Sequence, residues 1–368
     1  MARASRSPSS ARPPPPTAST RSSTAASGRR GATRMAGLTT LPDAATVARI
    51  VTVATGESPD DLRILGQGVT AVGWRVDARG GPYCVLIAIP RDVQAQQGRD
   101  EPAQFGARHA LLTALCEATP LVPRPIATSV DPEQSDPVAG RWAWAVTSLL
   151  EGERPGPEGV PEAAARDLGA VLAALHAIPA EGYGLLEDRI DLVRGVAADR
   201  GAGMLARWPA GFWPFDGRPL LSHPVARLAP SLIAGLSAMR EPLLRYAEAP
   251  SAVAACHTDL NASHFLLREG RLSGLIDFGD AAILPPAFDI ASFAYFQGWL
   301  LTDALIEGYA SNRIMREIRL VEAQQLAVAL ALQKVEKSAR ADDAVRRQYA
   351  LDFLAHTLPL AAARRSDA

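Results

Sequence analysis

Residues 255–291 read ACHTDLNASHFLLREGRLSGLIDFGDAAILPPAFDIA, and the organisation of the whole chain follows from this stretch. It contains two short apolar runs, 265–267 and 272–276, whose length is typical of strands. Glu269 and Gly270 lie between them, and glycine supplies the positive φ that a tight two-residue turn needs. The pattern therefore predicts an antiparallel β-hairpin.

The expected register of this hairpin brings two side chains with metal-binding chemistry together. With a two-residue turn, Arg268 faces Arg271 and His264 lies opposite Leu275. His264 is then a diagonal neighbour of Asp277 on one face of the hairpin. A three-residue turn would place the two side chains on opposite faces.

The spacing of the ionisable residues indicates a chemistry. Asp259 precedes the hairpin, His264 opens it and Asp277 closes it, in the pattern H-x-D-x4-H-x12-D. Kinase-type phosphoryl transfer uses such a layout: one aspartate orients the attacking hydroxyl and accepts its proton, while two further side chains hold Mg²⁺ against the phosphates. The alternative is that the acids cap turns and that His257 is a half-buried, hydrogen-bonded histidine.

The same stretch resembles the aminoglycoside phosphotransferase family. HTDLNASHFLL at 257–267 and GLIDFGDAAILPPAFDIA at 274–291 are similar to its patterns H-G-D-x4-N and I-D-[WF], with a later P-x-x-D. The metal-binding asparagine of most members falls on His264 here, as in the macrolide phosphotransferase branch, which carries H-G-D-x4-H. Because Mg²⁺ prefers oxygen ligands, this histidine bears on metal affinity and metal identity.

The resemblance implies a bilobal, protein-kinase-like α+β fold with a small antiparallel β-sheet lobe and a mostly α-helical larger lobe. It also implies transfer of the γ-phosphate of ATP or GTP to a hydroxyl of a small molecule, with antibiotics among the candidates. Asp259 would be the base, Asp277 would be the principal ligand of Mg²⁺, and His264 would be a second or a water-mediated ligand. The supporting positions are His257, which braces the loop, Asn261, a substitute metal ligand, and Asp289, which fixes the segment after Asp277.

The composition is that of an ordinary globular protein large enough for two lobes: 368 residues, 48% apolar and 21% charged. No apolar run approaches the roughly 18 residues that cross a bilayer. The net charge of −1 offers no basic surface for nucleic acid. Cys84, Cys116 and Cys256 are too widely spaced for a disulfide framework, so we expect a cytoplasmic protein without membrane or nucleic-acid partners.

Three regions are expected along the chain. Residues 1–38 are rich in Ser, Arg, Pro and Ala and hold almost nothing to bury, which predicts a disordered tail. Residues 39–147 should form the nucleotide-binding lobe. Residues 148–362 should form the catalytic and acceptor-binding lobe.

In the small lobe, a helix capped by Asp43 and stopped by Gly56 should precede strands at 62–65, 72–76 and 83–89. Gly66 and Gly68 lie between the first two strands, where backbone N–H groups would cover the nucleotide phosphates; a plain hairpin turn has the same pattern. A further strand, at 142–150, leads to the crossover between the lobes. There the resemblance implies that Thr147 and Leu149 read the adenine edge, and a simple antiparallel strand is the alternative.

The sequence differs from the family at the position of the cation that contacts the nucleotide phosphates. The third strand of the family ends in V-L-[RK]-[IV]-P, and the cation position falls on Ala88 here. Lysine cannot replace it nearby, because the only two lysines are Lys334 and Lys337. The glutamate that pairs with this cation on the next helix falls on Gly106 or Ala107, so both ends of the ion pair are missing.

Arg91 or Arg108 would have to supply the phosphate contact from another backbone position, a role for which the planar guanidinium is well suited. Without any such cation, phosphoryl transfer would lose a few kcal/mol of charge stabilisation, about the effect of removing one preorganised donor. A catalytically impaired, kinase-like binding protein, or pseudokinase, is therefore the main alternative.

The larger lobe is expected to be mostly helical. Residues 163–178 form an amphipathic pattern in which His176 is a structural residue near the helix end. Further helices are expected at 102–117 in the small lobe and, beyond the catalytic stretch, at 290–301, 302–309, 316–337 and 342–358. A Ser-His-Asp hydrolase built from Ser263, His257 and Asp277 is a weak alternative, because the chain lacks a G-x-S-x-G elbow.

Residues 185–250 form an insertion where the family builds its acceptor-binding wall. Four aromatic residues cluster there, either as packing between helices or as a substrate wall: Trp208, Phe212, Trp213 and Phe215. The insertion contains seven acids and eight arginines. A pocket for polycationic aminoglycosides should be more acidic, so this composition favours a bulky hydroxylated acceptor of the macrolide kind.

Overall fold

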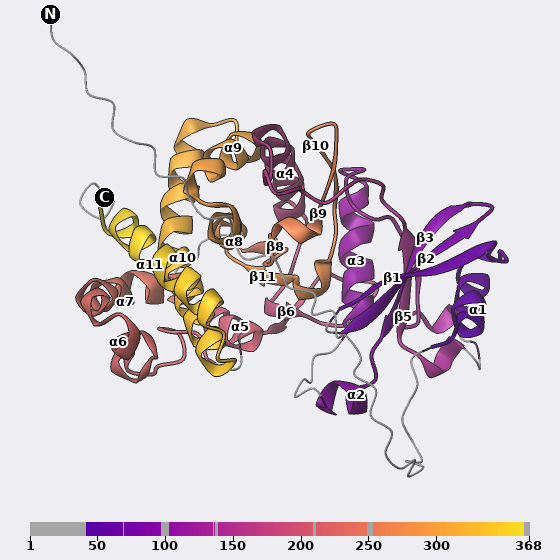
Figure 1. Cartoon of the computed structure of the whole chain (residues 1–368), viewed down its shortest axis with the longest axis horizontal. Coiled ribbons are helices and arrows are strands. Elements are labelled where there is room, and N and C mark those ends of the chain that lie inside the picture. Colours follow the sequence, from indigo (N-terminus) through magenta and orange to yellow (C-terminus); the bar gives the residue numbers. More distant parts are fainter. Residues whose placement is uncertain are drawn as a thin grey trace, which may run out of the picture.

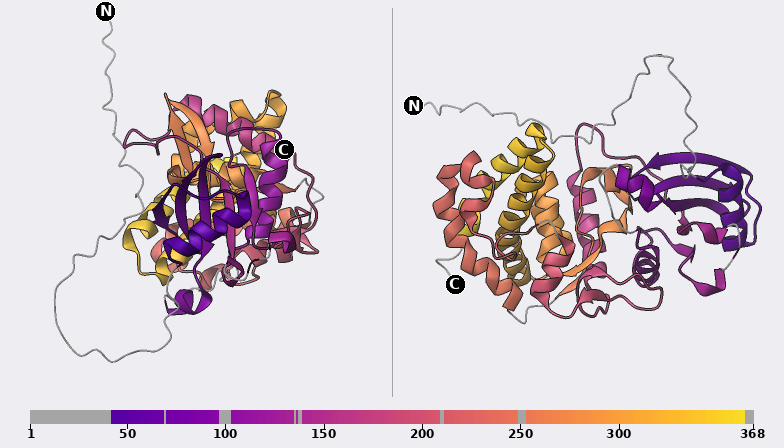
Figure 2. Two further views of the ribbon diagram at one scale, coloured as in Figure 1. Left: turned by 90° about the vertical axis from the view of Figure 1, so that its right-hand side faces the viewer. Right: turned by 90° about the horizontal axis from the view of Figure 1, so that it is seen from below.

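The computed structural model describes residues 42–68, 70–96, 103–134, 136, 139–208, 211–248 and 253–363. The predicted tail, 1–38, lies outside these ranges. The described chain has a strand-rich lobe at one end and a helix-rich lobe at the other (Figures 1 and 2). The predicted bilobal α+β fold is confirmed.

The small lobe is built on a five-stranded antiparallel sheet with the strand order β1-β2-β3-β5-β4. Helix α1 (Ala44–Thr55) begins after Asp43, which accepts the N–H of Thr46, and it ends at Gly56 with a φ of 74°. The predicted helix and strands are confirmed. The strands are β1 (Asp61–Gln67), β2 (Ala71–Ala78), β3 (Gly81–Ala88), β4 (Pro125–Thr128) and β5 (Trp144–Ser148).

Two helices follow β3: α2 (Arg91–Gln96) and α3 (Phe105–Cys116), which stands between the sheet and the large lobe (Figure 1). Most of the apolar side chains of α3 belong to the core of the large lobe, separate from the core between α1 and the sheet. Its N-terminus is fixed by Asp188 of the large lobe, because Asp188 Oδ1 accepts the N–H of Gly106 at 2.7 Å. Helix α3 lies in the range predicted for the small lobe, but its packing ties it to the large one.

The large lobe holds a four-stranded sheet, ordered β7-β6-β11-β8, and a separate hairpin of β9 and β10. Its strands are β6 (Tyr183–Leu186), β7 (Gly195–Ala197), β8 (Ala254–Cys256), β9 (Phe265–Arg268), β10 (Arg271–Leu275) and β11 (Ala282–Leu284). Its helices are α4 (Glu162–His176), α5 (Arg200–Arg207), α6 (Val225–Leu228), α7 (Ile233–Glu248), α8 (Ala287–Gln297), α9 (Trp299–Tyr309), α10 (Arg313–Arg340) and α11 (Ala344–Ala363).

The predicted helices are present, with one boundary displaced. The break between the first two C-terminal helices was expected at residue 302, but α8 ends at Gln297. Gly298 has a φ of 86°, a conformation that glycine adopts without steric cost, and it sets the break. Among the described residues, none of the helices combines the length and apolarity needed to cross a bilayer.

The hairpin is confirmed, but part of its predicted register is wrong. Arg271 pairs with Arg268 as expected, whereas Leu275 pairs with Phe265 and not with His264. The shift arises from a bulge at Ser273, whose hydroxyl donates to the backbone oxygen of Glu151 at 2.8 Å. A bulge adds one residue to one strand, so every pair beyond it moves by one position.

The aromatic cluster of the insertion is part of the interior. Phe212 stacks on Trp208, with ring centroids 4.2 Å apart, and also contacts Phe288 of α8. Trp208, Phe212 and Trp213 are all less than 10% exposed. Of the two interpretations of these residues, the structure therefore supports packing between elements over a substrate wall.

Arg218 connects two carboxylates that are almost inaccessible to solvent, and this network makes a stability prediction. Its guanidinium bonds Glu336 through two nitrogens, each at 2.8 Å, and Asp216 at 2.7 Å; the two carboxylates are 8% and 10% exposed. Arg218→Met removes the cation that pairs with Asp216 and leaves Glu336 with the more exposed Arg340, 2.7 Å from its Oε1. Because Arg218 itself is partly exposed, we expect the free energy of unfolding to fall by about 2–3 kcal/mol, below the usual loss for a fully buried pair.

Chemical denaturation of Arg218→Met and of Arg313→Met, which removes an exposed surface pair with Glu317, measures this difference. Arg218 also lowers the pKa of Glu336. A carboxyl with a lowered pKa in the folded state stabilises the fold above its ordinary pKa and loses that contribution as the pH falls through the lowered value. Equal losses of stability in the two variants would contradict the prediction.

Candidate active site

The loop after β8 carries Asp259, and His257 attaches this loop to the end of the hairpin. His257 Nε2 lies 3.0 Å from the backbone oxygen of Ile276, so Nε2 donates, and Nδ1 accepts the N–H of Asp259 at 3.4 Å. The ring is fully buried, and burial lowers its pKa. His257 is thus a neutral brace that links the backbone at Asp259 to the residue before Asp277.

Asp289 holds the same loop from the opposite side. Its carboxylate accepts the N–H of His257 at 2.8 Å and that of Thr258 at 2.7 Å, and it lies 3.0 Å from His176 Nε2. His176 in turn contacts the Tyr309 hydroxyl through Nδ1 at 2.9 Å. Asp289 and His176 are therefore engaged in structural bonds, and Asp289 holds the loop before the hairpin, whereas the predicted role was to fix the segment after Asp277.

The backbone of this loop is strained at Thr258. Its φ is 69°, which is costly for a β-branched residue, and the family pattern has glycine at this position. Three bonds compensate: the N–H donates to Asp289, Oγ1 donates to Asp280 O at 2.7 Å, and the backbone oxygen accepts from Ser292 Oγ at 3.1 Å. The surrounding structure thus fixes the direction in which Asp259 leaves the loop.

His264 lies between the two functional aspartates. It ends the short 3₁₀ helix η5 (Ala262–His264), and its Nδ1 lies 2.8 Å from the backbone oxygen of Asp259. A carbonyl oxygen only accepts, so Nδ1 donates and the lone pair of the neutral ring is on Nε2. Nε2 is 3.3 Å from Asp277 Oδ2. The predicted proximity of these two side chains is thus present despite the shifted register.

Asp277 begins the turn after β10 with a φ of 67°, which directs its half-exposed carboxylate toward His264. Burial would raise the pKa of Asp277, but the attraction of His264 in its protonated form, of Arg108 and of a protonated His257 outweighs it and holds the pKa below its ordinary value. Asp277 is therefore ionised at neutral pH. A carboxylate and an imidazole lone pair that face each other could hold a cation between them.

The donor set fits a divalent ion. Mg²⁺ takes ligands at about 2.0–2.1 Å in octahedral geometry, so adjacent ligand atoms lie about 3 Å apart. The 3.3 Å between His264 Nε2 and Asp277 Oδ2 is close to that spacing. The Nδ1–H bond to a backbone oxygen is the kind of outer contact that orients metal-binding histidines.

Asn261 supports Asp259 and is already engaged. Its Nδ2 donates to Asp259 Oδ2 at 3.2 Å, and its Oδ1 accepts the N–H of Ser263 at 2.9 Å and also the Ser263 hydroxyl. Ser263 is thus bonded to Asn261, whereas both ring nitrogens of His257 bond backbone groups. In the described residues, the Ser263–His257 contact that a hydrolase triad requires is therefore missing.

The residues assigned to the nucleotide side lie in the small lobe. Gly66 and Gly68 are exposed in and after β1, and Gly68 donates its N–H to the backbone oxygen of Ala71 at 2.9 Å. Thr147 is buried in β5, and Leu149 donates its N–H to the backbone oxygen of Pro82 at 3.0 Å. Because this amide is already bonded, its carbonyl is the group of Leu149 left to contact an adenine.

The structure explains why the ion pair of the family is absent. A Cβ on Gly106 would lie 2.9 Å from Val130 Cγ1 and 3.0 Å from Asp188 Oδ1, so a glutamate does not fit there. Ala88 ends β3 without a charged group. Of the two candidate arginines, Arg91 is exposed at the start of α2, whereas Arg108 is buried beside Asp277.

The sequence motifs did not predict that two cationic side chains lie near Asp259. Arg207, at the end of α5, makes an ion pair with Asp280 at 3.0 Å. Lys334 of α10 lies 5.3 Å from the ring centre of Phe296. Burial lowers the pKa of Lys334 to about 8, although the attraction of Asp259 works against this shift. Both cations come from helices far from the catalytic stretch in sequence, so only the fold brings them near it.

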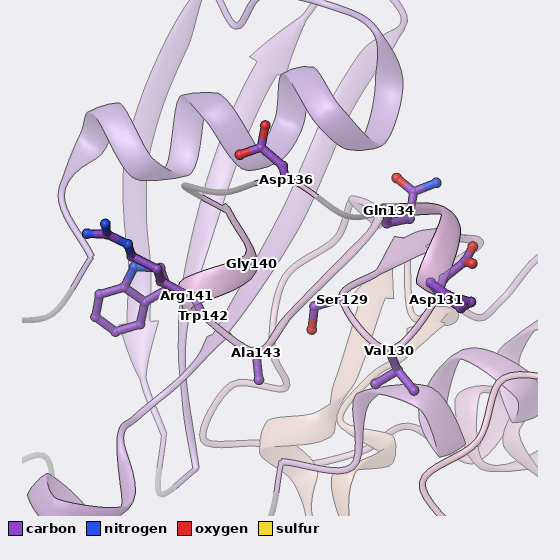
Figure 3. A pocket seen from close by; sticks show the side chains of 10 residues that line it. Ser129, Val130, Asp131, Gln134, Asp136, Gly140, Arg141, Trp142 and Ala143 are labelled. Atoms are coloured by element: carbon purple, nitrogen blue, oxygen red, sulfur yellow. The ribbon is translucent and has the colours of Figure 1, made fainter.

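One open cavity of about 700 Å³ lies elsewhere, in the small lobe, and is lined by the segment that connects β4 to β5 (Figure 3). Ser129, Asp131, Arg141 and Trp142 are among its lining residues, and the predicted site residues are not. The cavity is therefore separate from the cluster of Asp259, His264 and Asp277.

Comparison with solved structures gives low identities over most of the chain. The aminoglycoside phosphotransferase APH(4)-Ia, in a ternary complex with AMP-PNP and hygromycin B, aligns at 15% identity over 87% of this chain and 99% of its own, with a TM-score of 0.57. The GDP and kanamycin complex of APH(2")-IIia aligns at 17% identity over 84% and 97%, with a TM-score of 0.53. These likenesses show a shared fold.

A macrolide 2'-phosphotransferase from Brachybacterium faecium aligns at 16% identity over 83% of this chain and 96% of its own, with a TM-score of 0.47. No match was found among curated protein sequences. The profile of the phosphotransferase enzyme family matches residues 61–321, which include the sheet of the small lobe, the loop of Asp259 and the hairpin. The chain belongs to the phosphotransferase enzyme family and is a small-molecule kinase-like enzyme.

Proposed function

We propose that the protein transfers the γ-phosphate of ATP or GTP to a hydroxyl group of a small molecule, with Mg²⁺ bound by Asp277 and His264. The observation that carries the proposal is the pair of His264 Nε2 and Asp277 Oδ2, 3.3 Å apart beside the Asp259 loop. A divalent ion held there would neutralise charge on the phosphates. Asp259 orients the acceptor hydroxyl and takes its proton.

The supporting residues keep this geometry rigid. His257 and Asp289 fix the loop through backbone bonds, and Asn261 orients the Asp259 carboxylate. A loose phosphoryl-transfer transition state depends on positioning more than on basicity, so rigid placement is the main contribution of the protein.

On the nucleotide side, we propose that Gly66 and Gly68 cover the phosphates, that Thr147 and Leu149 border the base, and that an arginine, Arg91 or Arg108, contacts the phosphates. The relatives in the solved complexes bind AMP-PNP, ADP or GDP, which supports a nucleotide co-substrate. Three unpaired cysteines fit the proposal of a cytoplasmic enzyme.

The acceptor is proposed to be a bulky hydroxylated molecule with few positive charges, antibiotics of the macrolide kind included. Lys334 and Arg207 border the loop that carries Asp259 and offset part of the negative charge of its aspartates, so an acceptor with several ammonium groups would find less attraction there. Like charges placed together in a recognition site exclude the wrong partner.

A screen of purified protein with MgATP or MgGTP tests the function. We expect a mass increase of one phosphoryl group on a neutral or singly charged acceptor, such as a macrolide, and little product with aminoglycosides. Nucleotide consumption without a phosphorylated acceptor in any class would contradict transfer. If aminoglycosides were the main phosphorylated products, the proposed phosphoryl transfer would stand, but the proposed class of acceptor would be wrong.

Absence of nucleotide binding in the wild type would favour the pseudokinase alternative. Isothermal titration of ATP with and without Mg²⁺ separates the two explanations of a screen without product. An active enzyme whose acceptor is missing from the panel still binds nucleotide, whereas the pseudokinase alternative predicts no binding.

A further inference from the structure

Arg108 is a buried cation that makes no direct ion pair with any of the described residues. Its residue is 7% exposed, it lies on the inner side of α3, and among the described residues none of the carboxylates comes within 4.0 Å of its guanidinium. Its Nε is buried without a hydrogen-bond partner, and the contact the structure gives the group is with the ring of Phe105, 5.5 Å away. Burying an unpaired charge is costly, so such a group is typical of a site that receives an anion.

The guanidinium is directed at the metal-binding carboxylate. Gly279, in the 3₁₀ turn η6 (Phe278–Asp280), lets the guanidinium pack against the backbone: a Cβ there would lie only 2.6 Å from Arg108 Nη2 and 3.3 Å from Asp277 Oδ1, so a side chain at this position would collide with the arginine. The arginine and the carboxylate therefore lie close together on the same side of Gly279. An anion held by a metal ion on Asp277 would be within reach of the guanidinium.

The same guanidinium lies near the strand on which the family carries its cation. Burial lowers the pKa of Arg108, and the attraction that opposes this comes first from Asp277; the thiol of Cys84 on β3 also lies within electrostatic range. Cys84 and Ala88 share one face of β3, because side chains alternate along a strand and Tyr83, Val85 and Ile87 are buried on the other face.

We propose that Arg108 binds the phosphates of the nucleotide, so that the cation missing at Ala88 is delivered from helix α3 instead of from the end of β3. The inference rests on the proposed function. Helix α3 is suited to this task because Asp188 and the large-lobe core fix its position. The guanidinium is thus held beside Asp277 without the glutamate that the usual cation requires.

Arg108→Met tests the inference, because methionine keeps an apolar stem and removes the charge. Titration calorimetry measures ATP binding, and ligand-observed NMR measures the weaker binding of adenosine. We expect the Kd of ATP to rise about 10–100-fold, the effect of losing a hydrogen bond to a charged group, while the Kd of adenosine is unchanged. The melting temperature should not fall, because an unpaired buried charge has been removed.

Two comparison variants isolate the position of the charge. Arg240→Met removes an exposed arginine of α7 and changes the net charge equally, and its ATP affinity should be that of the wild type. Arg108→Lys keeps the charge but not the forked donor, and should lose less ATP affinity than Arg108→Met. The lysine variant also tests the inference if the methionine variant fails to fold.

The outcomes separate this inference from the function on which it rests. Wild-type ATP binding with unchanged binding in Arg108→Met, or an equal loss for ATP and adenosine, would overturn the role of Arg108 and leave the function intact. Loss of ATP binding in Arg91→Met alone would assign the contact to Arg91 and also overturn it. A wild type that binds neither ligand would remove the proposed function itself.

Discussion

Asp259→Asn is expected to lower kcat by about 10²–10⁴-fold, the usual contribution of a positioned base. Asparagine still bonds Asn261 and leaves the loop intact, because the loop is held by His257 and Asp289 through backbone groups. The Kd of the nucleotide should therefore stay unchanged. Steady-state kinetics with a phosphorylated acceptor from the screen, combined with nucleotide titration, measures both quantities.

Asp303→Asn is the matched control, because it makes the same change on the exposed side of α9 and should leave kcat unaltered. Equal kcat values for the wild type and Asp259→Asn would show that Asp259 is not the base. A large rise in the Kd of the nucleotide would instead assign Asp259 to nucleotide or metal binding.

Asp277→Asn is expected to abolish the Mg²⁺ dependence of nucleotide binding. A bound divalent ion supplies several kcal/mol of charge stabilisation to phosphoryl transfer, so we expect kcat to fall by about 10³-fold or more. Affinity for nucleotide in the absence of Mg²⁺ should change little, or improve, because a carboxylate that repels the phosphates is gone. Titrations with and without Mg²⁺ give the two affinities.

The pH dependence of the metal site follows from the lowered pKa of Asp277. The carboxylate is ionised at neutral pH, so the contribution of Asp277 to metal-dependent binding should be constant near neutrality and be lost in acid, as the pH falls through the lowered pKa. In Asp277→Asn this contribution to the pH dependence should disappear. An Mg²⁺ dependence that survives in the variant would contradict the assignment of Asp277 as the principal ligand.

The sequence predicted the hairpin, its two-residue turn and the meeting of His264 with Asp277, because apolar runs, glycine and spacing are local signals. It could not predict the bulge at Ser273. That shift depends on a bond to Glu151, more than a hundred residues earlier, and no local pattern records such a partner. The prediction of proximity survived because the backbone turn at Asp277 brings its carboxylate back toward His264.

Cations were the features hardest to foresee. The motif showed that the phosphate-binding cation of the family is missing at Ala88. Only the fold shows that Gly106 has no space for a glutamate and that Arg108 lies beside Asp277. Arg207 and Lys334 likewise reach the Asp259 loop from distant helices. The positions of these cations depend on tertiary packing, which composition and residue spacing do not predict.

The most direct test concerns the ion between the hairpin and the turn after it. Pulsed electron paramagnetic resonance of the protein with Mn²⁺ and a non-hydrolysable ATP analogue reports imidazole nitrogens bound to the metal. The expected result is coupling to one imidazole nitrogen, absent in His264→Asn, together with loss of bound metal–nucleotide in Asp277→Asn. Mn²⁺–nucleotide bound without any imidazole coupling, or coupling that persists in His264→Asn, would contradict the site.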